Sequence, residues 1–286
     1  MFRVRLFGLD LKWIHKLVPP LQFASSVIRQ ALIMDIEVCV DSIESAIAAD
    51  RGGANRIELC SALSEGGITP SGGLLSAVRA AVNIDVFVII RPRGGDFVYS
   101  DRELDIMRAD ILEAKKRKVN GVVLGILTTS GDVDVPRTKE LIELARPLRV
   151  TFHRAFDLCA NLDRALENVI ACGADRILTA GGKANAIEGA DTLARLRKHA
   201  GKRISIMAGG GIRAANVRAI AIKTGVHEVH TSLSRKMESP SPDGITEDLA
   251  RLIGHKGFRV PEADVRAFKA ALESIDLEAE TGASLH

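Results

Sequence analysis

Two short segments near the start of the chain repeat the same chemistry. Residues 36–39 read Ile-Glu-Val-Cys, and residues 57–60 read Ile-Glu-Leu-Cys. Each segment alternates as a β-strand does, so its glutamate and its cysteine share one face of the strand. If the two strands are parallel neighbours, two carboxylates and two thiols converge. Because a carboxylate on a buried strand face costs several kcal/mol unless it is paired or used, the repeat marks either a functional site or an ion-pair network.

The two cysteines, Cys39 and Cys60, are candidate ligands for a soft metal ion. Thiolates select Cu(I), zinc or iron–sulfur centres over hard cations. Neighbouring strands lie about 4.8 Å apart, and two metal–sulfur bonds of about 2.3 Å span a similar distance, so a two-coordinate Cu(I) ion is geometrically feasible. Zinc fits less well because it takes four ligands and no CxxC or HxxxH spacing supplies the others. The alternative is that both thiols are small buried fillers, as free cysteines often are.

A larger set of polar residues is candidate catalytic machinery. Arg91 and Arg93 flank Pro92 and so have the same parity along the chain, and two guanidinium groups side by side suit a carboxylate or phosphate substrate. His153 has the chemistry of a general acid or base. The alternative is a network of glutamates and arginines that satisfy one another. The full candidate set is Glu37, Glu58, Arg91, Arg93, His153 and Asp157.

A run of three glycines is a candidate anion site. It directly precedes a helix predicted over 213–224, and backbone N–H groups at a helix N-terminus bind anions. Two serines after the following strand supply hydroxyl groups, and phosphate sites in barrels often use the loops after strands seven and eight. The alternative is a tight turn that requires small residues. The residues of this candidate site are Gly209, Gly210, Gly211, Ser232 and Ser234.

Strand-like and helix-like runs alternate from Met34 onward. Strands are predicted at 36–40, 56–60, 86–91, 121–127, 149–153, 176–180, 203–208 and 227–232. Helices are predicted at 42–51, 73–82, 101–118, 136–146, 161–173, 187–200, 213–224 and 262–275. Eight strand–helix units in order imply a parallel sheet, and eight strands close a (β/α)8 TIM barrel, an α/β fold. An open doubly wound sheet is the alternative. Such a sheet usually has a glycine cluster after its first strand, and this chain has Asp41 and Ser42 there instead. The candidate residues follow the strands' carboxyl ends, where barrel enzymes have their active sites.

The composition limits the partners and the compartment. Of the 286 residues 47% are hydrophobic, and the net charge of +3 comes from lysines and arginines spread along the chain. The scarcity of aromatic residues (4%) and the lack of a basic cluster argue against a nucleic-acid partner. No 18-residue apolar run is present, which argues against a membrane span. The cysteines have no framework of short spacings, which favours reduced thiols in the cytoplasm.

The chain ends differ from its body. Residues 1–33 are basic and poor in acids, and Met34 stands directly before the first predicted strand. We interpret 1–33 as an N-terminal extension outside the fold, with a targeting peptide as the alternative. Residues 34–275 are predicted to form a single barrel domain. Residues 276–286 are predicted to be a flexible tail.

Several motifs together resemble one known family, the CutC copper homeostasis family. The resemblance runs from about Met34 to Ser234. It implies a cytoplasmic TIM barrel that is usually a homo-oligomer, and it implies Cu(I) binding through the cysteines that align with Cys39 and Cys60. The motifs that carry it are Glu37–Ser42, Arg56–Cys60, Glu65–Ser71, Arg91–Phe97, Thr151–Asp157 and Ala208–Ile212.

Two functional hypotheses follow. The first is a copper homeostasis protein that binds Cu(I) and takes part in intracellular copper handling or tolerance. The second is a TIM-barrel enzyme of the isomerase, lyase or hydrolase class that acts on a small anionic or phosphorylated metabolite at the C-terminal end of the barrel. Copper binding needs only the two cysteines, whereas the enzyme hypothesis also accounts for the polar residues Arg91, Arg93, His153 and Asp157.

Overall fold

Eight parallel strands close into a barrel in the order of the sequence. The computed structural model describes residues 34–238 and 256–281. Each strand pairs with its neighbours along the chain, and the eighth pairs with the first, which confirms the predicted (β/α)8 fold. The strands are β1 (Asp35–Val40), β2 (Arg56–Leu59), β3 (Asp85–Ile89), β4 (Gly121–Leu124), β5 (Arg149–Phe152), β6 (Arg176–Thr179), β7 (Ser205–Ala208) and β8 (Glu228–Thr231).

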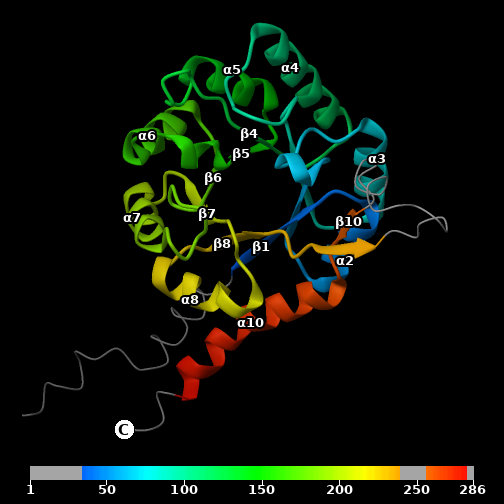
Figure 1. The fold of residues 1–286 in the computed structure, drawn as a ribbon, viewed down its shortest axis with the longest axis vertical. Coiled ribbons are helices and arrows are strands. Elements are labelled where there is room, and N and C mark those ends of the chain that lie inside the picture. Colours follow the sequence, from blue (N-terminus) through cyan, green and yellow to red (C-terminus); the bar gives the residue numbers. More distant parts are fainter. Residues whose placement is uncertain (1–33, 239–255, 282–286) are drawn as a thin grey trace, which may run out of the picture. The chain divides into compact units, whose positions relative to one another are not determined.

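A ring of helices surrounds these strands (Figure 1). Local side chains cap the helix N-termini: Ser42 and Asn161 each accept a hydrogen bond from a first-turn N–H, and Ser100 forms a capping box with Glu103. The helices are α2 (Ile43–Gly52), α3 (Gly72–Ala81), α4 (Asp101–Lys116), α5 (Val135–Ala145), α6 (Leu162–Cys172), α7 (Ala190–Ala200), α8 (Ala214–Thr224) and α10 (Glu262–Thr281).

Four short elements are additional to the prediction. Two 3₁₀ turns, η2 (Leu63–Glu65) and η3 (Arg154–Leu158), follow β2 and β5, and an antiparallel pair, β9 (Arg235–Glu238) with β10 (Lys256–Arg259), follows β8. Segments of three to five residues are too short to show a hydrophobic period.

The chain ends are described only in part. The predicted extension 1–33 lies outside the described residues. Helix α10 is continuous to Thr281, beyond the predicted helix end at 275, and 282–286 lie outside the described residues. No helix in the described part of the chain is both long and apolar enough to span a membrane.

Buried ion pairs fill the N-terminal end of the barrel interior. Arg56, the first residue of β2, contacts both Glu37 and Glu228, and Arg176 at the start of β6 also contacts Glu228. All four side chains are buried. A buried charge is tolerated when it is paired and hydrogen-bonded. These four residues pair with one another, and we call them the ion-pair plug.

The ring of Phe87 lies against this plug and depends on a glycine opposite. The Arg56 guanidinium lies 4.9 Å from the Phe87 ring centroid, a cation–π contact. Gly121, the partner of Phe87 on β4, leaves the space that the ring occupies. A Cβ atom on Gly121 would lie 2.5 Å from the ring and 2.7 Å from the Arg149 carbonyl oxygen.

We expect Gly121→Ala to lower the free energy of unfolding by about 1–3 kcal/mol, because the added methyl group overpacks the barrel interior. Gly73→Ala is the matched control. At Gly73, inside α3, a Cβ atom would come no nearer than 3.8 Å to another group, so alanine should raise stability by up to about 1 kcal/mol. Urea denaturation of both variants checks the pair. Equal changes in the free energy of unfolding for the two variants would contradict the packing argument.

Candidate functional site

The two thiols predicted to converge do so. Cys39 is on β1 and Cys60 directly follows β2, and their Sγ atoms lie 3.6 Å apart. Both side chains are buried, and the Cys60 thiol also donates to the Val40 carbonyl oxygen at 3.5 Å. The hydrogen bond with Cys60, together with burial, raises the pKa of Cys39 well above that of an ordinary thiol. Cys39 is therefore held as a protonated thiol until something displaces its proton.

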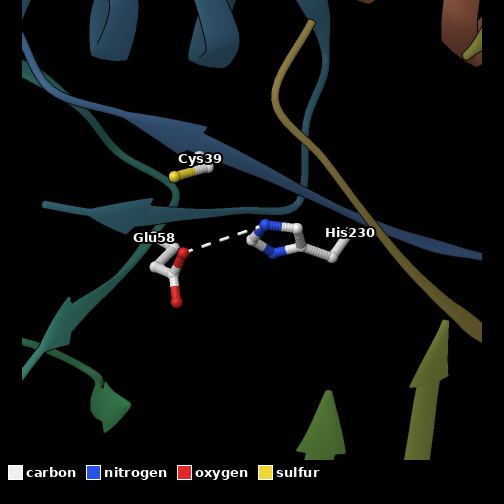
Figure 2. Close-up of side chains that lie close together, drawn as sticks. All are labelled: Cys39, Glu58 and His230. Carbon is white, nitrogen blue, oxygen red and sulfur yellow. Dashed lines mark ion pairs between the residues drawn. The ribbon is translucent and has the colours of Figure 1, made fainter. Parts of the chain in front are cut away.

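The register of β1 and β2 adds two further ligand types beside Cys39. Cys39 pairs with Glu58 and not with Cys60, so the two Glu-x-Cys segments are offset by two residues. His230 reaches the same place from β8 (Figure 2). A ligand atom from each of Cys39, Glu58 and His230 lies within 4.8 Å of the other two, and His230 Nε2 is 3.8 Å from a Glu58 carboxylate oxygen. This thiol–carboxylate–imidazole group is a candidate metal centre.

Glu37, the first glutamate of the repeat, contacts His230 and so orients its ring. Glu37 Oε1 and His230 Nδ1 are 2.7 Å apart, and the other oxygen of Glu37 contacts Arg56. Burial alone would raise the pKa of Glu37, but Arg56 and His230 outweigh it and lower the pKa to about 2. Burial likewise opposes protonation of His230, but the two glutamates prevail and raise its pKa. Glu37 is therefore an ionised partner of Arg56 and His230.

Glu58 has the opposite environment. Burial is the largest influence on it and raises its pKa above the usual value for a glutamate. The two glutamates of the repeated motif thus differ in character, although their sequence contexts are nearly the same. Environments that shift the pKa values of two carboxyl groups in opposite directions are typical of functional sites.

A cavity of about 180 Å³ opens beside these groups at the C-terminal ends of the strands. It joins the Cys39–Glu58–His230 group to polar residues that follow β3 and β5. We call it the mouth cavity. Its lining residues are Cys39, Glu58, Leu63, Gly66, Ile89, Arg91, Phe97, His153, Arg154, Leu178 and His230.

Arg91 and His153, both predicted from the sequence, line this cavity and are buried. Arg91 donates to the backbone carbonyl oxygens of Glu65, Gly67 and Gly95 at 2.7–3.0 Å. Burial, reinforced by the positive charge of Arg91, lowers the pKa of His153 to about 3, so His153 is neutral.

Arg93 and Asp157 do not line the mouth cavity. Strand β3 ends at Ile89, so the parity argument that paired Arg93 with Arg91 does not hold beyond it. The Arg93 side chain is 38% exposed and pairs with Glu103 and Asp96. Asp157 accepts hydrogen bonds from the backbone N–H groups of Ala180 and Gly182 at 2.9–3.0 Å, and it anchors the loop after β6.

The glycines predicted as an anion site are bonded within the fold. Gly209 N–H donates to the Thr179 carbonyl oxygen at 3.0 Å, and the Gly210 carbonyl oxygen accepts from Ala186. The carbonyl oxygen of Gly211 accepts from the Asn216 side chain at 2.9 Å. These three glycines and the two serines, Ser232 and Ser234, are not among the lining residues of the mouth cavity. Ser234 instead lines a separate surface depression beside Arg213.

Two important residues were missed by the sequence prediction. His230 was seen only as part of the end of the last strand, although the two-residue period of β8 places it on the same face as Glu228. Arg154 follows His153 directly, and it lines the mouth cavity while pairing with Asp157 at 2.8 Å. His230 could not be assigned without knowing that β8 lies beside β1.

Comparison with known proteins gives one consistent family. The model of the CutC family matches residues 34–235. CutC family proteins of Chromobacterium violaceum and Vibrio cholerae are 50% and 53% identical over 204 and 208 residues, which cover 71% and 72% of this chain and 83% and 81% of theirs. A human protein named copper homeostasis protein cutC homolog is 50% identical over 204 residues, 71% of this chain and 75% of its own.

Solved structures agree on the fold. The crystal structure of CutC from Streptococcus agalactiae superposes with a TM-score of 0.66 at 36% identity, and it covers 69% of this chain and 97% of its own. Thiamine phosphate pyrophosphorylase from Pyrococcus furiosus superposes at 0.51 with 18% identity, covering 86% and 98% of the two chains, and shares the barrel fold alone.

The neutral state of His153 predicts part of the pH dependence of stability. Its pKa is lowered to about 3 in the folded protein, so the unfolded chain binds the proton more tightly. The stabilisation is complete above pH 6.5 and is lost as the pH falls towards 3. Between pH 6.5 and 5 the loss should reach about 2 kcal/mol.

His153→Gln should remove this component, because glutamine does not titrate. Urea denaturation of wild type and variant at the two pH values isolates the effect of His153 from that of other histidines. A wild-type and a variant protein that lose equal stability between the two pH values would contradict the burial argument.

Proposed function

Because the chain belongs to the CutC family, we propose that it binds Cu(I) through Cys39 and Cys60 and takes part in copper handling in the cytoplasm. The observation that carries this proposal is the 3.6 Å separation of the two buried Sγ atoms. Thiolates are soft ligands and prefer Cu(I) to hard cations. The name of the human relative, copper homeostasis protein cutC homolog, supports the same role. All four cysteines in the described part of the chain are free thiols, which fits a reducing compartment.

The separation of the thiols favours a bent site with a third ligand. At the observed separation, two metal–sulfur bonds of about 2.3 Å would meet at roughly 100°, which is far from linear. His230 is the best third ligand, because imidazole suits copper better than a carboxylate does. Its Nδ1 already pairs with Glu37, and this leaves Nε2 for the metal. Such a carboxylate behind the ligating histidine is usual in metal sites and fixes the ring.

We expect the Cys39→Ser, Cys60→Ser double variant to lose tight Cu(I) binding, because hydroxyl groups are poor ligands for a soft ion. The Cys159→Ser, Cys172→Ser double variant is the matched control. These two thiols are also buried, but each contacts a backbone carbonyl oxygen in a different part of the barrel wall. Competition titration of the reduced proteins against a Cu(I) chelator makes the comparison. The assignment is wrong if the first variant competes as well as wild type.

Cu(I) affinity should rise with pH. The pKa of Cys39 is raised by its hydrogen bond with Cys60 and by burial, so the ion must displace at least one proton. Each proton released makes the apparent affinity about tenfold higher per pH unit. Competition titrations at pH 6.5 and 7.5, corrected for the chelator's own pH dependence, measure the slope. A flat profile would show that binding releases no proton and would argue against ligation by these thiols.

A further inference from the structure

The mouth cavity has hydrogen-bond donors that Cu(I) binding does not use. Four buried side-chain N or O atoms of the described residues lack a hydrogen-bond partner, and two of them are Arg91 Nε and His153 Nε2. Both residues line the mouth cavity, Arg91 from the segment after β3 and His153 from the segment after β5. A buried donor without an acceptor is unfavourable and rare in native proteins. The Tyr99 hydroxyl, a third atom of the four, interacts with Arg91 outside this cavity. His153 Nε2 has no such neighbour among the four and points to an acceptor group that comes from a ligand.

Arg91 also has an uncompensated charge. Its terminal nitrogens donate only to backbone carbonyl oxygens, and no carboxylate of the described residues forms an ion pair with it. Its guanidinium stacks on the ring of Phe97 at 4.8 Å from the centroid. A buried cation normally has a counter-ion. The guanidinium is therefore fixed in position and lacks an anion.

His153 offers its second donor in a defined tautomer. Nδ1 accepts a hydrogen bond from the Ala155 N–H at 3.2 Å, so in the neutral ring the proton is on Nε2. The ring packs at 4.7 Å from the Phe97 ring, centroid to centroid. It also lies so close to Gly125 that a Cβ atom there would be 2.6 Å away. His153 therefore cannot turn away easily, and its N–H donor is preorganised.

The other side of the cavity has an acceptor. Glu58 lines it and hydrogen-bonds with the Cys39 thiol, and His230 is 3.8 Å away, which is longer than a hydrogen bond. A carboxylate has two oxygens, so Glu58 keeps room to accept from a ligand. One wall thus has N–H donors and a positive charge, and the other has carboxyl oxygens. At about 180 Å³ the space is smaller than the roughly 300–1,000 Å³ pockets that hold drug-sized ligands, so it suits a molecule of few heavy atoms.

We propose that the mouth cavity binds a small hydroxycarboxylate, whose carboxylate group lies against Arg91 and His153 and whose hydroxyl group donates to Glu58. The carboxylate supplies both the acceptor and the negative charge that the donor wall lacks. The hydroxyl group gives the opposite wall a donor, which distinguishes the ligand from a simple carboxylate or from phosphate. The site does not require copper.

Calorimetric titration of the metal-free protein tests the ligand class. Lactate and glycolate are the probes, with propionate and acetate as matched compounds that lack the hydroxyl group, and inorganic phosphate as the anion control. We expect each hydroxy acid to bind at least tenfold more tightly than its matched acid, because the matched acid cannot donate to the Glu58 oxygen that faces the ligand. Absence of lactate binding at tens of millimolar, or equal binding of lactate and propionate, would overturn the proposal.

Variants locate the ligand within the barrel. His153→Leu removes the Nε2 donor and should weaken lactate binding at least tenfold, whereas His153→Gln keeps an N–H donor and should retain most of it. Arg108→Gln, at an exposed ion pair on α4, is the surface control and should bind as wild type does. A folded His153→Leu protein with unchanged affinity would refute the assignment.

A measurement on the wild-type protein covers the case in which His153→Leu does not fold. In protein labelled with ¹⁵N-histidine, lactate should shift the ring resonance of His153, identified by its absence in His153→Gln. Propionate at the same concentration should shift it less. A resonance that does not respond to lactate would overturn the proposal independently of the variants.

Discussion

The carboxylate of Glu37 connects the two ends of the barrel interior. One oxygen contacts Arg56, which belongs to the ion-pair plug at the N-terminal end, and the other contacts His230, which faces the mouth cavity. Removing one partner of a buried ion pair typically costs about 3–5 kcal/mol, because the remaining charge is left uncompensated. Replacing Glu37 would therefore destabilise the fold, and its carboxylate cannot shift without disturbing both Arg56 and His230. The orientation of the His230 ring, and with it the geometry around Cys39, follows from a charge pair that serves stability.

Much of the fold was predictable because its physics is local. Strand-like and helix-like runs depend on residues close in sequence, and their alternation identified the eight strand–helix units. The repeated Glu-x-Cys pattern identified the thiols. What failed depended on where strands end and which strands are neighbours. Arg93 was paired with Arg91 by parity, but β3 ends before both of them. His230 acquires its importance only because β8 closes against β1, and no local pattern contains that pairing.

The glycine run shows a second limit of prediction. Its composition is what a phosphate-binding turn requires, but the same freedom also serves a compact turn. In the structure the Gly209 N–H and the carbonyl oxygens of Gly210 and Gly211 have partners within the barrel. Arg91 Nε and His153 Nε2 have none among the described residues. Which polar groups remain unused depends on long-range packing, which residue type alone does not reveal.

The closure of β8 on β1 has a consequence for how the protein is made. Cys39 and Cys60 emerge early from the ribosome and need only one crossover to meet, whereas Glu37 and His230 are 193 positions apart. A nascent chain thus carries its thiol pair through most of synthesis before the imidazole arrives. In the proposed Cu(I) site the third ligand, His230, is supplied only by the step that seals the barrel, so full Cu(I) affinity would report that the chain has finished folding.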